Sequence, residues 1–346
     1  MARKNALRGG MVLVCAALSL SCDVPEFDSQ SEVNGLRILG LSSSAQIVAP
    51  GQPLTLDALW VDSRPDANDH VIAAWFPGCL NPEFTSFEAC VYELNNLTVE
   101  PGESWPAAFS PIAGTRLETE VDPTVLEGRD DFGIQGFFFA ACRGDRFEYA
   151  PTRHAAVPIV CRDAAGNTVH QPDFRLGIRT VTALPVKEEI PSANPVITGF
   201  QVDGAFYEAH CLGDACMGFQ KVDCESHACP QIRAGDCNED EAKGSKKCDG
   251  GRFHVLVDEQ SVNIDWLQGD DEGLQTAEVF ARYFVTVGRV EPDFDLLHER
   301  EPVGQSAKWD RESQSVLTAA GQVFVWAVVY DSLGAVSWAG IGVETF

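Results

Sequence analysis

Short apolar runs, rich in branched and aromatic residues, recur along the whole chain, and glycine- and proline-containing segments separate them. Almost no stretch has the 3.6-residue periodicity of an amphipathic helix, so the chain is predicted to be all-β. Regular spacing of short strands is typical of a β-sandwich, and a length of 346 residues favours two domains. In the first half the runs are 36–41, 54–61, 71–76, 132–141, 157–161 and 180–186.

The pattern restarts after a charged, proline-containing stretch at residues 187–194. The runs of the second half are 196–202, 255–264, 279–287, 323–329 and 336–343. We therefore predict two tandem immunoglobulin-like β-sandwich domains, residues 34–186 and 195–346, joined by a linker at 187–194. The second domain carries a disulfide-rich loop insertion at 211–248.

The first 21 residues are predicted to be a signal peptide, because a basic start precedes an apolar run that is too short to span a bilayer. Ser21-Cys22 closes this leader and resembles the lipobox of bacterial lipoproteins. That resemblance implies that Cys22 is acylated and becomes the first mature residue, with residues 22–33 as the lipidated cysteine and a short tether. The alternative is ordinary secretion with cleavage nearby. No later run reaches transmembrane length, so the mature chain is expected to meet the lipid bilayer only through its acyl anchor.

Ten further cysteines are disulfide candidates, which favours an oxidising compartment. Four lie in the first half and six in the insertion: Cys79, Cys90, Cys142, Cys161, Cys211, Cys216, Cys224, Cys229, Cys237 and Cys248. Even numbers in each half favour disulfides closed within each domain, with the pairing of the six left open. A zinc site built from four of the six thiolates is the alternative, but a polar loop in an oxidising compartment favours disulfides.

Both ends of the chain carry a recognisable pattern. The start has an opening strand at 36–39, a Pro50-Gly51 turn and an Ala74-Trp75-x-x-x-Cys79 strand, and the end has a hairpin run at 325–336. Together these resemble secreted Ig-like lipoproteins of myxobacteria and their relatives. The resemblance implies the sandwich fold and no activity, since that group is largely uncharacterised. Trp75, on the expected third strand, also matches the core tryptophan of immunoglobulin sandwiches.

A net charge of −26 repels phosphate backbones and anionic headgroups, which excludes nucleic-acid binding and electrostatic membrane docking. It favours a basic or calcium-bridged partner. Oxygen-bearing side chains at alternate positions in the insertion suggest a loose calcium site, for which the candidate ligands are Asp236, Asn238, Asp240 and Asp249. The alternative is a solvated acidic loop.

No nucleophile elbow, zinc-protease motif or phosphate-binding glycine loop is present, so the chain is predicted not to be an enzyme and to need no cofactor besides the possible calcium. We expect a lipid-anchored cell-envelope protein, with the outer membrane favoured and the domains periplasmic or surface-exposed. It would act as a binding, adhesion or scaffold module for a protein or glycan, with the insertion as its binding loop. The alternative is a secreted carboxylate-dependent hydrolase or carbohydrate-active protein that uses Asp270, Asp271 and Asp293.

Overall fold

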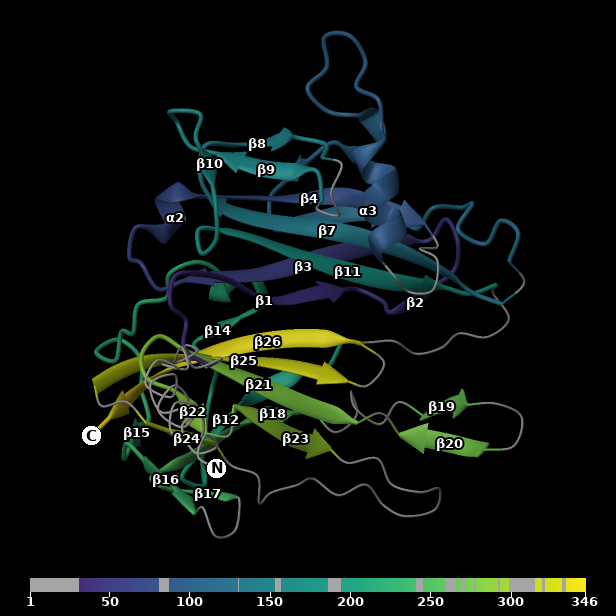
Figure 1. The fold of residues 1–346 in the computed structure, drawn as a ribbon. Helices are drawn as coiled ribbons and strands as arrows, with labels where there is room; N and C mark the ends of the chain where they lie inside the picture. The colour runs from purple at the N-terminus through teal and green to yellow at the C-terminus, as the bar shows by residue number, and fades with distance from the viewer. Residues whose placement is uncertain are drawn as a thin grey trace, which may run out of the picture.

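The structure, a computed structural model, is nearly all β and forms two sandwiches stacked one on the other (Figure 1). It describes residues 31–80, 87–129, 131–152, 157–185, 194–240, 245–258, 265–268, 272–276, 278–291, 293–298, 315–318, 321–331 and 334–346. The predicted signal peptide, the lipidation site Cys22 and almost all of the predicted linker lie outside these residues.

The first sandwich pairs a three-stranded sheet with a five-stranded sheet. The smaller sheet consists of β1 (Leu36–Ser43), β3 (Pro53–Asp62) and β6 (Arg116–Glu120). The larger consists, in spatial order, of β2 (Ile47–Val48), β11 (Phe174–Ala183), β7 (Gly133–Arg143), β4 (Val71–Leu80) and β5 (Ile112–Ala113). All ladders are antiparallel except β2 with β11. This order corresponds to strands A, B and E facing G, F and C of the immunoglobulin fold.

Trp75 lies at the centre of this sandwich, as expected for the core tryptophan on strand C. Its side chain is fully buried and packs on Phe139 of β7 with ring centroids 5.0 Å apart. The indole N–H donates to the Thr115 carbonyl at 2.8 Å. The buried cluster around it consists of aliphatic and aromatic side chains, whereas antibody domains have an inter-sheet disulfide beside this tryptophan.

A third layer covers the outer face of the five-stranded sheet. It consists of α3 (Phe87–Asn95), the short helix η2 (Ala107–Phe109) and a small sheet of β8 (Arg146–Tyr149), β9 (Ile159–Arg162) and β10 (Thr168–Val169). Disulfides Cys79–Cys90 and Cys142–Cys161 tie this layer to β4 and β7. Strand β7 is therefore buried on both faces, which explains the unbroken run Phe137-Phe138-Phe139.

The second sandwich is likewise built from two facing sheets. One sheet consists of β13 (Ala205–Tyr207), β12 (Ile197–Val202), β18 (Arg252–Val257), β24 (Ser315–Leu317) and β22 (Val290–Glu291). The facing sheet consists of β14 (Cys211–Leu212), β26 (Val336–Thr345), β25 (Gly321–Asp331), β21 (Val279–Val285) and β23 (Phe294–His298). Strand β15 (Gln231–Ile232) pairs in parallel with β26, and β19 (Asp265–Gln268) with β20 (Glu272–Thr276) forms a separate hairpin.

Tyr283 occupies the centre of the second core, on the strand that corresponds to that of Trp75. It is fully buried, meets Phe253 edge-on at 5.1 Å, and its hydroxyl accepts the Val255 N–H at 3.1 Å. Burial raises the pKa of the Tyr283 phenol well above its ordinary value. This buried hydroxyl fixes one orientation of the ring within an otherwise apolar core.

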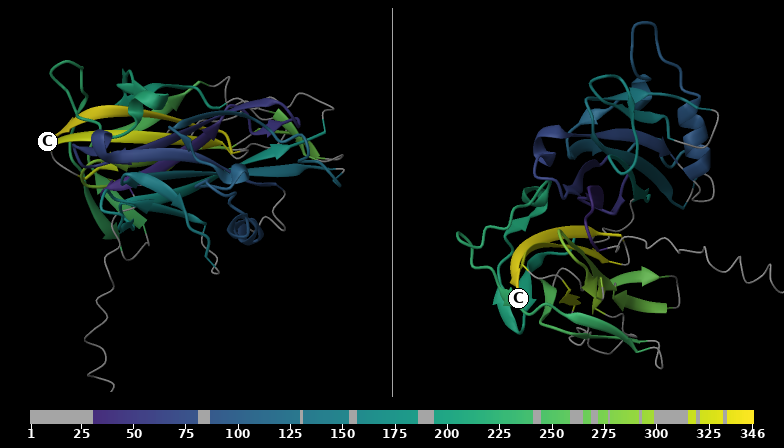
Figure 2. Two further views of the ribbon diagram at one scale, coloured as in Figure 1. Left: turned by 90° about the horizontal axis from the view of Figure 1, so that it is seen from above. Right: turned by 60° about the vertical axis from the view of Figure 1, so that its left-hand side comes forward.

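A shared hydrophobic layer joins the two sandwiches, and we call it the interdomain layer. Its buried members come from both halves of the chain: Val33, Leu39, Leu59, Val61, Cys211, Cys216, Phe324, Trp326, Val328, Val336 and Trp338. Strand β25 sends odd-numbered residues into its own core and even-numbered residues into this layer. Figures 1 and 2 show β26, in yellow, lying along the boundary beneath β1. A large apolar interface of this kind restrains relative domain motion.

Polar contacts add to the interdomain layer. Arg179 of β11 donates to the Ser43 hydroxyl at 3.0 Å and to the Gly334 carbonyl of the second sandwich at 2.8 Å, and it also contacts Gln46. Desolvation lowers the pKa of the Arg179 guanidinium to about 10, and the nearby Asp331 opposes that shift. The guanidinium therefore links the edge of one sandwich to the β25–β26 turn of the other.

The predicted tether needs a correction at its end. Residues 31–33 do not hang free, because they pair with the end of β21: the Val33 N–H donates to the Val285 carbonyl at 2.9 Å, and the Val285 N–H donates to the Ser31 carbonyl at 2.8 Å. Val33 is fully buried in the interdomain layer. Burial of the apolar Val33 side chain between the two sandwiches is favourable in free energy, so this end of the segment packs against the domains instead of extending into solvent.

The cysteine-rich insertion was predicted to be one loop, but its first part contains short regular elements that pack against β26. Cys211 pairs with Cys216 and Cys224 with Cys229, so the zinc alternative fails for these four thiols. Strand β14 and helix η3 (Gly213–Cys216) cover the open edge of β26 and press against the first sandwich. An unprotected edge strand invites aggregation, and this segment covers it.

The last part of the insertion is a hairpin of β16 (Asp236–Asp240) and β17 (Ser245–Asp249). Its register makes Cys237 and Cys248 direct partners, so a disulfide between them stays a prediction. The calcium candidates lie on this hairpin rather than in a loop, with Asp236 opposite Asp249 and Asn238 opposite Lys247. Their side chains lie outside the described part of the structure.

Gly218 is the residue that lets the insertion approach the first sandwich. Its φ is +75° and its N–H donates to the Trp60 carbonyl at 3.0 Å, while a Cβ there would collide with the Asn68 amide oxygen. We expect Gly218→Ala to lower the free energy of unfolding by about 2 to 3 kcal/mol, from backbone strain plus the collision. Gly51→Ala is the matched control, because Gly51 has φ +74° and open space around it. Gly51→Ala should lower the free energy of unfolding by only about 1 kcal/mol, measured by denaturant unfolding. Equal losses in the two variants would show that the contact between Gly218 and Asn68 adds nothing beyond backbone strain.

Candidate binding cleft between the two sandwiches

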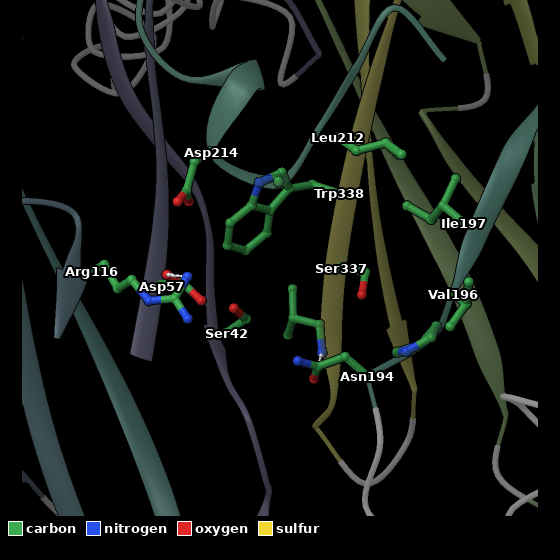
Figure 3. A pocket seen from close by; sticks show the side chains of 13 residues that line it. Ser42, Asp57, Arg116, Asn194, Val196, Ile197, Leu212, Asp214, Ser337 and Trp338 are labelled. Carbon is green, nitrogen blue, oxygen red and sulfur yellow. Dashed lines mark hydrogen bonds and ion pairs between the residues drawn. The ribbon is translucent and has the colours of Figure 1, made fainter. Parts of the chain in front are cut away.

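A cleft of about 360 Å³ opens where the two sandwiches meet, and we call it the interdomain cleft. The first sandwich contributes β1, β3 and β6, and the second contributes residues 194–197, the β14–η3 segment and β26. Figure 3 shows the side chains of both sandwiches pointing into the same space. The interdomain layer fixes these walls relative to one another, so the cleft is preorganised.

Asp57 forms the charged side of the cleft. Strand alternation places it on the face of β3 that carries Leu59 and Val61, toward the second sandwich. Its register partner Arg116 approaches only to 3.8 Å, and the same Arg116 lies 3.9 Å from Glu118. Partial burial raises the pKa of the Asp57 carboxyl, Arg116 opposes that rise, and Asp214 of the second sandwich adds to it. Asp57 is thus a partly desolvated carboxylate with incomplete charge compensation.

Trp338 forms the opposite wall. Its side chain is 5% exposed and packs against Gly40 of β1, where a Cβ would lie 3.1 Å from the indole ring. Within the described residues, neither the buried Trp338 Nε1–H nor the buried Asp57 Oδ1 has a hydrogen-bond partner. An unpaired buried polar group costs about 1 to 3 kcal/mol, and here one donor and one acceptor lie in the same cleft.

The rim of the cleft is apolar and its base is polar. Leu212 and Val196 are 55% and 53% exposed, respectively. At the base, the Asn194 amide donates to the Ser43 carbonyl at 2.9 Å and accepts the Val336 N–H at 3.1 Å. One side chain therefore bridges the two sandwiches. Exposed aliphatic groups beside buried, unpaired polar groups are typical of a binding site.

Sequence reasoning did not find this cleft. Asp57, Asp214 and Trp338 come from three distant segments, and none belongs to a catalytic or ligand-binding motif. One signal was present in β26, where Trp338, Gly340 and Gly342 alternate with apolar residues. The two glycines lack a side chain and so leave room for the disulfide sulfur atoms of the insertion, and the tryptophan faces the cleft. Of the carboxylates suggested for a hydrolase, Asp270 and Asp271 lie outside the described residues.

Within the described residues, no group of three or more His, Cys, Asp or Glu side chains is arranged to hold a metal ion. The same part of the chain has no helix long and apolar enough to cross a membrane.

His210 holds the insertion against β26 and is the clearest acid-sensitive group nearby. Its Nδ1 accepts the Gly342 N–H at 3.0 Å, so the neutral ring carries its proton on Nε2. Burial lowers the pKa of His210, and the His227 ring, with its centroid 5.1 Å away, lowers it further. Because the folded pKa lies below the unfolded value of about 6.5, the unfolded chain binds more protons near pH 6. The stability contributed by His210 is present above that pH and is lost as the pH falls through the folded pKa.

We therefore expect the thermal midpoint of the wild type to fall more steeply between about pH 7 and about pH 5 than that of His210→Gln, which keeps an acceptor without titrating. His170→Gln, at an exposed position, should follow the wild type. Parallel pH profiles for the wild type and His210→Gln would show that His210 does not carry this dependence.

No protein-family model and no curated protein matches the chain. Among solved structures, alpha-2-macroglobulin of Escherichia coli activated by porcine elastase aligns with 90% of this chain and 22% of its own length, at 11% identity and a TM-score of 0.21. The Y1175G mutant of Salmonella alpha-2-macroglobulin aligns with 88% of this chain and 16% of its own length, at 10% identity and a TM-score of 0.21. The chain spans less than a quarter of either protein, and this level of likeness does not bear on function.

Proposed function

We propose that this chain is a lipid-anchored protein of the cell envelope, attached through Cys22 to the outer membrane, that acts without catalysis as a binding, adhesion or scaffold module. The observation that carries the proposal is the interdomain layer, because it holds a cleft with unpaired polar groups in a fixed shape. Four disulfides support an oxidising compartment. A rigid scaffold that positions exposed segments is a common arrangement for binding sites.

The anchor is tested by metabolic labelling with an alkyne fatty acid in cells of the native host. The wild type should carry the label and sediment with outer-membrane vesicles, whereas Cys22→Ala should lose both properties. An unlabelled wild type, or a labelled Cys22→Ala variant, would overturn the lipid anchor. Protease treatment of intact and lysed cells then distinguishes a surface-exposed protein from a periplasmic one.

The binding role is tested by site-specific photocrosslinking in the same cells. A photoreactive residue at Leu212, on the rim of the cleft, should give a discrete adduct with a protein or glycan. The same residue at Val99, an exposed position of the first sandwich away from the cleft, is the control. Turnover of polysaccharide or ester substrates by the purified protein would instead favour the hydrolase.

A further inference from the structure

We propose that the interdomain cleft accepts an arginine side chain from an extended, basic segment of a partner protein, with a peptide carbonyl of that segment bound by the Trp338 indole N–H. This inference rests on the proposed binding function and gives its partner a chemistry. It is carried by three features of the same cleft: an undercompensated carboxylate, a buried unpaired donor and an exposed apolar rim.

The first feature is charge. Asp57 and Asp214 face each other across the junction, and Figure 3 shows both on the side toward which the Trp338 indole points. Arg116 is the cation of this cleft lining, and its 3.8 Å approach to Asp57 is too long for a hydrogen bond. The Asp57 Oδ1 atom is left buried without a donor. A guanidinium suits such a site better than an ammonium, because it is less strongly hydrated and donates through a planar fork.

The second feature is the indole. A cation cannot pair with the Trp338 N–H, which needs an acceptor, whereas the backbone beside an arginine supplies carbonyl groups. The two unpaired atoms of the cleft thus require opposite partners, and a peptide that carries an arginine offers both. The 5% exposure of Trp338 also leaves no open ring face for a sugar to stack on, which favours a protein over a glycan.

The third feature is the rim. Leu212 and Val196 are exposed on the second-sandwich side of the opening, where the methylene stem of an arginine can lie against them. At longer range the net charge of −26 draws basic segments toward the molecule and raises their rate of encounter. Recognition therefore combines long-range attraction with a local pocket for one side chain.

The test uses the complete lipidated chain in detergent micelles, with its tryptophan indoles labelled with ¹⁵N. Seven indole signals are expected, and Trp338→Phe identifies the one that reports on the cleft. The probe is the capped tripeptide acetyl-Ala-Arg-Ala-amide. Its control carries citrulline, which has the shape of arginine without the charge. We expect the arginine peptide to shift the Trp338 signal and the citrulline peptide to bind about tenfold more weakly.

Variants locate the effect. Asp57→Asn should weaken binding of the arginine peptide about tenfold, and Asp214→Asn, at an exposed position, should weaken it less. Glu100→Gln removes one exposed charge away from the cleft and should bind as the wild type does. Thermal melting of each variant shows whether it is folded. If Asp57→Asn does not fold, the comparison of Asp214→Asn with the wild type still tests the role of the acidic groups.

Three results would overturn the inference: no shift of the Trp338 signal with the arginine peptide, an equal shift with the citrulline peptide, or an equal loss of binding in Glu100→Gln. A larger shift with maltoheptaose than with the peptide would also overturn it, in favour of a glycan. If Leu212 still gives crosslinked adducts in cells, the proposed binding function survives while this assignment of its partner fails.

Discussion

Replacing Trp326 with alanine should lower the free energy of unfolding by about 3 to 5 kcal/mol and loosen the contact between the two sandwiches. Trp326 is fully buried on the outward face of β25 and packs against Phe324 with ring centroids 4.9 Å apart. Its indole N–H donates to the Cys216 carbonyl at 3.1 Å, which ties the insertion to the interdomain layer. The substitution removes that bond and leaves a cavity between the sandwiches.

Two measurements separate this effect from ordinary core loss. Denaturant unfolding gives the stability change, and small-angle X-ray scattering gives the radius of gyration, which should rise for Trp326→Ala. The neighbouring Val325 faces the opposite way, into the core of the second sandwich, so Val325→Ala should cost stability without a rise in radius. An equal rise in both variants would show that the interdomain layer does not hold the sandwiches together.

The all-β class was predictable from the sequence because strand periodicity and turn residues are local properties. The continuous runs at Phe137–Phe139 and 323–329 were predicted only as strands, and the structure shows that both are buried on two faces. What covers the second face could not be predicted, because the covering residues come from distant segments. Phe109 and Tyr149 cover β7, and Leu39 of the other sandwich covers β25.

The packing of the insertion could not be predicted from the sequence either. Its polar composition and dense cysteines indicated a stapled, exposed loop. The edge of β26 needs a partner, however, and the pairing of Cys211 with Cys216 gives a segment compact enough to provide it. The cleft was missed for a related reason, since Asp57 and Trp338 acquire their unpaired atoms only when the two sandwiches meet.

The second large effect concerns Asp62, a fully buried carboxylate at the end of β3. It accepts from Arg64 Nε at 2.8 Å and Nη2 at 2.7 Å, and it lies 3.4 Å from Arg143 Nη1. The same two guanidiniums reach outward to Asp173 at 2.6 Å and to Asp66 at 2.9 Å. Asp62 therefore anchors a network that joins the end of β3 to the end of β7 and the start of β11.

Asp62→Ala should lower the free energy of unfolding by about 3 kcal/mol, because it removes the buried carboxylate that Arg64 and Arg143 share and leaves each guanidinium with only its outer carboxylate partner. Asp62→Asn keeps the shape of the side chain but not its charge. Its free energy of unfolding should lie between those of the wild type and Asp62→Ala, because a neutral amide oxygen accepts hydrogen bonds more weakly than a carboxylate. Asp145→Asn removes an exposed carboxylate at the same end of the sandwich and should change stability by less than about 0.5 kcal/mol. Denaturant unfolding of the three variants ranks them. If Asp62→Ala loses no more free energy of unfolding than Asp145→Asn does, the buried ion-pair network does not stabilise the fold.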